Sequence, residues 1–224
     1  MKKRILWAGI VGAAAVLITG GILASNMGFK LNMSLVGPQG APATTGTNLV
    51  ALPFNQQTSL TSVANLLADI SPCPASNVNL ISRFVRSADA VSFYSCLGGD
   101  LFTLTPGDGY FVQMDLTQSY ITVGSHDPSA TINLLGPQGA PATTGTNPYA
   151  YPYHSVSATV AGLLTEVSPC SPGPSSVNLI SRFVRSADAV SFYNCLGGDL
   201  FGLVPGDAYL IQVNTDVSFV PAHY

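Results

Sequence analysis

The pattern of apolar and polar residues in the first half of the chain predicts short strands around one helix. Apolar residues alternate with polar ones over 31–35, and large apolar residues occupy every second position over 50–54. This is the period of a strand with one buried face. Over 63–70 the apolar residues recur at i, i+3, i+4 and i+7. Only a helix places such residues on one stripe, and Thr61 is the residue expected to cap it.

The chain then returns to strand patterns. Residues 78–85 and 90–96 are rich in Val, Ile, Phe and Tyr and predict a β-hairpin that turns at Ser87–Asp89. The sequence Pro-Gly-Asp-Gly at 106–109 predicts a turn into a further strand, and a last strand over 119–123 follows. The predicted order is therefore β-β-α-β-β-β-β.

The same series of elements is encoded a second time. Three blocks recur at an offset of 99 residues: GPQGAPATTGT at 37–47 and 136–146, VNLISRFVRSADAVSFY at 78–94 and 177–193, and CLGGDLF at 96–102 and 195–201. Repetition at a fixed period indicates repeated structural units. The predicted fold class is α+β and strand-rich, with two tandem small antiparallel β modules of about six strands and one short helix each.

We place the boundaries from the repeat and from the amino-terminal residues. Module one spans 25–125, a joint spans 126–130, and module two spans 131–224. Residues 1–24 contain a basic start, Lys2-Lys3-Arg4, followed by twenty residues without a charge. That pattern predicts a signal peptide or a membrane anchor, and either one places the modules outside the cytoplasm. Contact with a membrane is expected only through this segment, if it is uncleaved.

The repeated GPQGAPATTGT segment is rich in Gly, Pro and Thr and breaks regular structure. It is either a plain connection between strands or a docking loop displayed twice. Because it links the strand at 31–35 to the rest of module one, that strand could instead add to the sheet edge of a neighbouring molecule.

Charge is scarce in both modules. Five basic and eleven acidic residues follow Ala24, so the surface is unsuited to nucleic acid. Four cysteines occur at matched positions, and even numbers in an exported chain predict disulfides. We expect them to pair within each module, Cys73 with Cys96 and Cys170 with Cys195. A zinc site is disfavoured because zinc takes about four N or S ligands.

The repeat also serves as an internal control for chemistry, because residues for a shared task should occur in both copies. No histidine is repeated and no known catalytic motif appears, so no catalytic residue and no cofactor are predicted. Six repeated ionisable residues are candidates for ligand or ion contacts: Arg83, Asp100, Asp108, Arg182, Asp199 and Asp207.

Structural roles are the default for these residues. Asp89, Asp100 and Asp108 fall in predicted turns, where Asp caps its own backbone, and Arg83 is expected to pair with an acid or to grip a ligand carboxylate. Calcium is the one metal that this oxygen-rich set could take. Three tyrosines at 149, 151 and 153 suggest a sugar-stacking strip, although core packing suits them better because their counterparts in module one are not Tyr.

Several short motifs resemble a recurring module of exported bacterial proteins. They are a Gly-Thr-Asn strand opening that ends in Pro plus an aromatic residue (GTNLVALPF, GTNPYAYPY), a Pro-Gly-Asp-x-Tyr strand (PGDGYFVQM, PGDAYLIQV) and the ending ITVGSHDP. Leu49 and Pro148 stand where the usual aromatic would follow Gly-Thr-Asn. The resemblance implies an exported module but no activity, and it assigns no catalytic residue.

Three functions follow in order of expectation. The first is a non-catalytic secreted or cell-surface protein with a structural, assembly or adhesive role, whose partners are copies of itself or other surface proteins and glycans. The second is an extracellular binding module for a glycan or protein. The third is a secreted hydrolase that uses His126 or His154 with nearby Asp residues.

Overall fold

The computed structural model describes residues 28–53, 55–56, 60–125, 127, 129–170 and 175–223. The expected export segment at 1–24, the strand residue Phe54 and the candidate His126 lie outside these residues. Within the described part of the chain, no helix has both the length and the apolar character needed to cross a bilayer.

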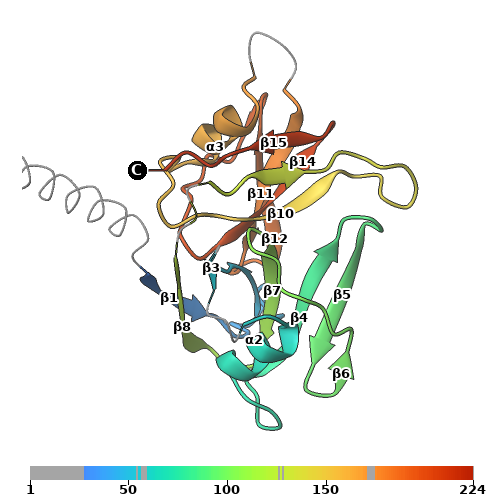
Figure 1. Cartoon of the computed structure of the whole chain (residues 1–224). Coiled ribbons are helices and arrows are strands. Elements are labelled where there is room, and N and C mark those ends of the chain that lie inside the picture. The colour runs from blue at the N-terminus through green and yellow to red at the C-terminus, as the bar shows by residue number, and fades with distance from the viewer. Residues whose placement is uncertain are drawn as a thin grey trace, which may run out of the picture.

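The first module contains one helix and eight strands among the described residues (Figure 1). In chain order they are β1 (Phe29–Leu35), β2 (Thr47–Ala51), β3 (Asn55–Gln56), α2 (Val63–Ile70), β4 (Val78–Val85), β5 (Ala90–Ser95), β6 (Gly98–Gly99), β7 (Gly109–Met114) and β8 (Gln118–Ser125).

The second module repeats this series. Its elements are β9 (Ile132–Leu134), β10 (Thr146–Ala150), α3 (Val160–Val167), β11 (Val177–Val184), β12 (Ala189–Asn194), β13 (Gly197–Gly198), β14 (Ala208–Val213) and β15 (Val217–Phe219).

Each module is built on a five-stranded antiparallel sheet. The strand order is β2-β7-β4-β5-β6 in the first and β10-β14-β11-β12-β13 in the second. The first and last strands of each module pair separately, as β1-β8-β3 and as β15-β9. The structure confirms a strand-rich α+β chain built from two similar antiparallel modules, with β3, β6 and β13 as short additions to the predicted order.

Each module has a core of its own. One cluster of buried apolar residues draws only on positions between Met33 and Tyr120, and the other only on positions between Leu134 and Phe219. The helices contribute the stripes predicted from their periodicity, because all four apolar residues of the i, i+3, i+4, i+7 pattern are buried in each copy. Burial of this stripe explains why two eight-residue helices, too short to be stable alone, form here.

The helix cap differs from the one predicted. Ser62, not Thr61, is the N-cap of α2, and its hydroxyl accepts a hydrogen bond from the N–H of Asn65. Thr159 occupies the same place before α3. Both residues have extended backbone angles, as a cap requires.

Strand β1 is an integral part of its own module. It pairs with β8 along its whole length, from Phe29↔Gly124 to Leu35↔Gln118, and Met33 and Leu35 are buried in the first core. The expectation that this strand is free to join a neighbouring molecule is therefore wrong. Removing it would take apolar side chains out of the core and uncover β8.

A buried asparagine ties the end of β1 to the sheet. The Asn48 side chain accepts a hydrogen bond from the N–H of Val36 and donates to the carbonyls of Val36, Gly46 and Val112. Asn147 makes the equivalent four contacts in module two. Both side chains are completely buried. The Asn of the Gly-Thr-Asn motif thus supplies backbone pairing at the point where the chain leaves the first strand.

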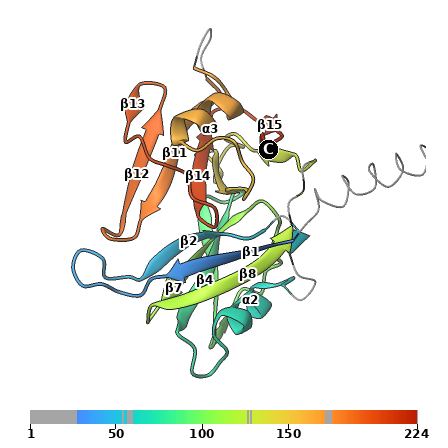
Figure 2. The same cartoon turned by 90° about the vertical axis from the view of Figure 1, so that its left-hand side faces the viewer.

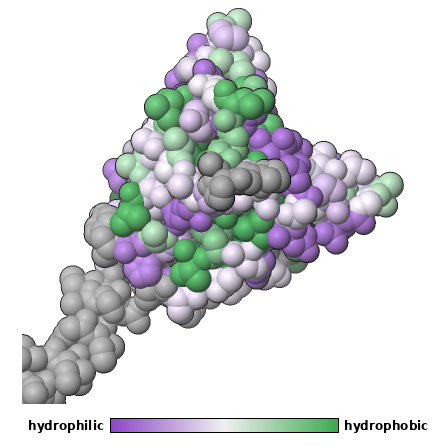
Figure 3. Space-filling model, turned by 90° about the horizontal axis from the view of Figure 1, so that it is seen from above, coloured by the Kyte–Doolittle hydropathy of each residue, from purple (hydrophilic) through white to green (hydrophobic). Residues whose placement is uncertain are grey.

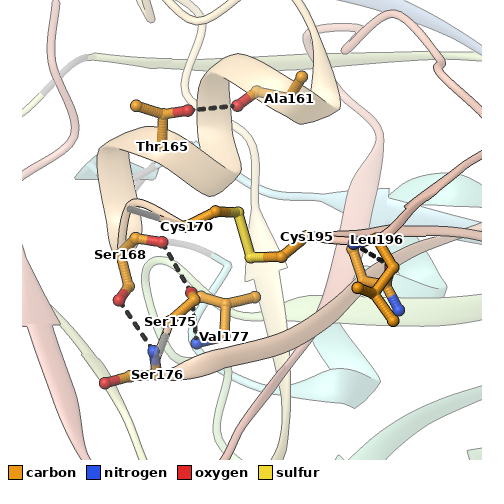
Figure 4. The surroundings of a disulfide bond; sticks show 10 residues. Ala161, Thr165, Ser168, Cys170, Ser175, Ser176, Val177, Cys195 and Leu196 are labelled. Carbon is orange, nitrogen blue, oxygen red and sulfur yellow. Dashed lines mark hydrogen bonds between the residues drawn. A yellow bond between two sulfur atoms is a disulfide. The ribbon is translucent and has the colours of Figure 1, made fainter. Parts of the chain in front are cut away.

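Both predicted disulfides are present, Cys73–Cys96 and Cys170–Cys195. Each joins the segment after the helix to the turn that leads into the short edge strand, and Figure 4 shows the bond of module two. In module two, Ser168 at the end of α3 also holds the segment before β11, through hydrogen bonds with Ser175 and Ser176. Two disulfides indicate an oxidising, extracytoplasmic setting.

Candidate interaction surfaces

The two modules pack against each other through the outer faces of their five-stranded sheets. Cross-strand partners lie on one face of a sheet, and the pairs Leu49↔Phe111, Phe111↔Ser82 and Ser82↔Phe93 run in a row across module one. The part of this face on β2 and β7 is covered by the other module, in a shared cluster of seven apolar residues: Leu49, Ala51, Phe111, Ala150, Phe183, Ala208 and Leu210.

Reciprocal backbone contacts join the same region. The N–H of Ala51 donates to the carbonyl of Gly206 at 2.8 Å, and the N–H of Ala150 donates to the carbonyl of Gly107 at 2.9 Å. The approach is close, since a Cβ added at Gly109 would lie 2.4 Å from the Cβ of Ala208. Equivalent strands of the two copies therefore make equivalent contacts, as in a dimer with twofold symmetry.

The repeated loops complete this reciprocal contact. Asp89, at the tip of the β4–β5 hairpin, accepts hydrogen bonds from the backbone N–H groups of Thr143 (2.5 Å) and Thr144 (2.8 Å) and from both hydroxyls. Asp188, in the equivalent turn of module two, accepts the same four bonds from Thr44 and Thr45. Each GPQGAPATTGT loop therefore docks on the hairpin of the other module.

The repeated GPQGAPATTGT loop was expected to be either a plain connection or a docking loop. It is both, because it connects two strands and docks on the opposite module. This docking also corrects the role expected for Asp89. Asp89 was predicted to cap the backbone of its own turn. Its carboxylate instead accepts hydrogen bonds from backbone N–H groups of the opposite module. The Thr-Thr pair and the turn Asp are both in repeated blocks, but nothing in the sequence indicates that they meet.

Docking through these two carboxylates is expected to weaken in acid. Desolvation is the largest single effect on the pKa of Asp89 and raises it. The hydrogen bonds from Thr144 and Thr143 together outweigh this effect and hold the pKa below its ordinary value of 3.8. The pKa of Asp188 is lowered in the same way by Thr45 and Thr44. A lowered pKa in the docked state means that docking is favoured above the ordinary pKa and is lost as the pH falls below it.

A protease site placed in the joint at 126–130 tests this expectation. After cleavage, the halves should elute together at pH 7 and separate more readily below about pH 4. The double variant Asp89→Asn/Asp188→Asn should already dock weakly at pH 7 and lose most of this pH dependence. A cleaved wild-type protein that dissociates equally at both pH values would contradict the assignment.

The candidate aspartates Asp108 and Asp207 each pair with an arginine of their own module. Arg86 forms an ion pair with Asp108, and Arg185 forms one with Asp207. Burial raises the pKa of Asp108 above its ordinary value, and the positive charges of Arg86 and Arg83 oppose that rise. Arg83 was expected to pair with an acid, but Asp108 forms its ion pair with the neighbouring Arg86.

Arg83 stacks instead on an aromatic ring. Its guanidinium carbon lies 4.7 Å from the ring centroid of Phe102, and Arg182 lies at the same distance over Phe201. The Nε atoms of both arginines are buried and have no hydrogen-bond partner among the described residues. A cation over a ring face is a stabilising arrangement in its own right.

Asp100 and Asp199 lie after the short edge strands. Each accepts a hydrogen bond from a serine hydroxyl of the neighbouring strand, Ser92 at 3.1 Å and Ser191 at 2.9 Å. No group of three or more His, Cys, Asp or Glu residues that could hold a metal occurs in the described part of the chain.

Two grooves lie where the loops cross to the opposite module. The larger, of about 470 Å³, lies between the first module's Gln39 and Leu49 and the second module's Arg182, Arg185 and Asp207. The smaller, of about 380 Å³, lies between Arg86 and the second module's repeated loop. Two of the six sequence-predicted contact residues, Arg182 and Asp207, thus line the larger groove.

The tyrosine strip of module two divides between core and surface. Tyr149 and Tyr151 are buried, as expected for core packing. Tyr153 is exposed and stacks on Phe29 of module one, with the ring centroids 4.6 Å apart. The candidate His154 lies edge-on to Tyr153, so it stands among aromatic rings at the boundary between the modules.

Four large apolar side chains are exposed at equivalent positions in both modules, and we name these two sets the exposed quartets. They are Val91, Phe93, Leu97 and Leu101 in module one, and Val190, Phe192, Leu196 and Leu200 in module two. Leu97 is 100% exposed and Leu196 is 97% exposed. Figure 3 shows strongly hydrophobic residues reaching the surface at several separate places on the face seen from above.

The quartets were missed by sequence reasoning. Val91 and Phe93 were assigned to a strand, and an alternating strand does not reveal which face is covered.

No protein-family model matches this chain, and neither a curated protein nor a solved structure is significantly similar to it.

Proposed function

We propose that the protein is a non-catalytic structural or adhesive component, secreted or held at the cell surface, that assembles with other molecules through its exposed quartets. One observation carries the proposal. Two identical sets of large apolar side chains remain exposed on modules that are otherwise stapled and docked. Apolar patches on soluble proteins commonly mark interaction sites.

The uses found for the charged residues support the same proposal. The repeated Arg and Asp side chains form ion pairs, ring contacts or bonds to the opposite module. These contacts stabilise the two-module unit itself. The exposed quartets are therefore the duplicated feature that faces solvent, and they are apolar.

The proposal is tested in the cells that make the protein. We expect chemical cross-linking to capture it outside the cytoplasm in large complexes, and we expect Leu97→Ser/Leu196→Ser to lose them. Leu116→Ser is the matched control, because Leu116 is 62% exposed but belongs to neither quartet. A cytoplasmic protein, or complexes unchanged in the double variant, would refute the proposal.

The larger groove favours a second candidate function, a binding module for a glycan or acidic ligand. Its lining combines two arginines and one aspartate with apolar side chains. Among the described residues, Arg182 stacks on Phe201 and its charge acts on Asp207, but the salt bridge of Asp207 is with Arg185. A glycan array probed with the purified protein tests this. A selective signal that Arg182→Ala removes and Arg83→Ala preserves would favour binding over assembly, and the absence of any selective signal would reject it.

A further inference from the structure

We infer that the partner of each exposed quartet is a quartet on a second copy of this chain, so that molecules link one to the next through two equivalent contacts. The inference rests on the proposed function and names its partner. It is carried by the sheet face on which Val91 and Phe93 lie, by the chemistry around the quartets and by their number.

Two residues of the quartet, Val91 and Phe93, continue a sheet face that already binds another module. Phe93 lies in the same cross-strand row as Leu49 and Phe111, through Ser82. The Leu49–Phe111 half of the row is covered by module two, whereas Val91 and Phe93 remain exposed. The covered half packs on the equivalent sheet of the other copy, so this surface is complementary to a module of its own kind.

The chemistry of the edge suits an apolar contact between like surfaces. Between residues 90 and 101 the only charged side chain is Asp100, which is engaged by Ser92. The edge strand β6 consists of two glycines with positive φ and offers little backbone for strand addition. The contact must therefore come from the four side chains, with no like charges opposed across it.

A lipid surface suits the quartets less well. Peripheral binding to anionic membranes relies on Lys and Arg around the apolar residues. The four arginines of the modules lie in ion pairs or over Phe rings, and Lys30 lies on β1, in the other sheet of its module. No basic residue is in either quartet.

The size and placement of the quartets set the strength and the form of the association. Four such side chains expose apolar surface on the order of 400 Å², below the ~800 Å² per partner of a stable interface. Association should be weak and concentration-dependent. The β5–β6 and β12–β13 edges lie on separate outer margins of the molecule (Figures 1 and 2), so two contacts per molecule allow growth beyond a dimer.

Valency provides the test, by sedimentation of the native protein and its variants over increasing concentration. The wild type should form species larger than dimers. Leu97→Ser alone and Leu196→Ser alone should each stop at dimers, because one quartet remains. The double variant should stay monomeric, and Leu116→Ser should behave as the wild type. Thermal melting and non-reducing mass spectrometry establish that each variant is folded and oxidised.

Three results would overturn the inference. They are a wild type that stays monomeric up to about 1 mM, single variants that still grow beyond dimers, and a Leu116→Ser variant as impaired as the double variant. A monomeric wild type that binds lipid vesicles through Leu97 and Leu196 would assign the quartets to membranes. If the purified protein is monomeric but its complexes in cells require both leucines, the proposed function stands with a different partner.

Discussion

Replacing Asn48 with alanine is expected to lower the free energy of unfolding by about 3 kcal/mol, because an unpaired buried polar group costs about 1–3 kcal/mol. The substitution leaves both the N–H and the carbonyl of Val36 without the partner that Asn48 provides. It also empties a completely buried site where β1 enters the loop. This is a large part of the ~5–15 kcal/mol that stabilises a typical domain.

Denaturant unfolding followed by far-UV circular dichroism measures this loss. Asn147→Ala should show a loss of similar size, since Asn147 makes the equivalent bonds in module two. Asn79→Ala is the matched control, because the Asn79 side chain bonds Gln113 at an exposed position. It should change stability by about 0.5 kcal/mol or less. Equal losses at Asn48 and Asn79 would show that burial of the asparagine is not what matters.

The second large effect is expected from the disulfides. Cys73→Ser/Cys96→Ser should lower the free energy of unfolding by about 3 kcal/mol in the chain-entropy model, since the bond closes a loop with a sequence separation of 23. Without it, the unfolded chain gains conformations, whereas the fully buried residues of the first core are kept.

The second module supplies the replicate for this experiment. Cys170→Ser/Cys195→Ser removes a bond with a sequence separation of 25, so its effect should match the first to within a few tenths of a kcal/mol. Thermal unfolding with and without reductant provides an independent measurement. Wild-type protein that melts at the same temperature in both conditions would contradict a stabilising role.

Much of the fold of each module could be predicted because its signals are local. The stripe from Val63 to Ile70 specifies a helix wherever it is placed, and the matched spacing of the cysteines predicts their pairing. The turn at 106–109 and the hairpin at 78–95 are likewise encoded in short segments. The cap was misplaced by one residue because Thr61 and Ser62 are both good caps, and backbone geometry alone distinguishes them.

The surfaces could not be predicted in the same way, because they depend on residues far apart in the chain. Arg83 and Arg86 are chemically alike, and only the register of β4 against β7 decides which of them meets Asp108. The docking of Asp89 on Thr143 and Thr144 joins two repeated blocks whose contact depends on how the modules pack. The exposure of Phe93 follows from the same packing, since the covered half of the sheet face is the half on β2 and β7.

The sequence by itself determined the two copies, their strands and helices, the paired cysteines and the expected export, because periodicity, repetition and composition act over short distances along the chain. The tertiary structure alone decided that β1 closes its own module, that each repeated loop docks on the opposite hairpin, and that one apolar quartet per module stays uncovered. Those outcomes depend on which surfaces can be buried together once both modules have formed. The repeated loops and hairpins have identical sequences, so the sequence does not state which loop contacts which hairpin.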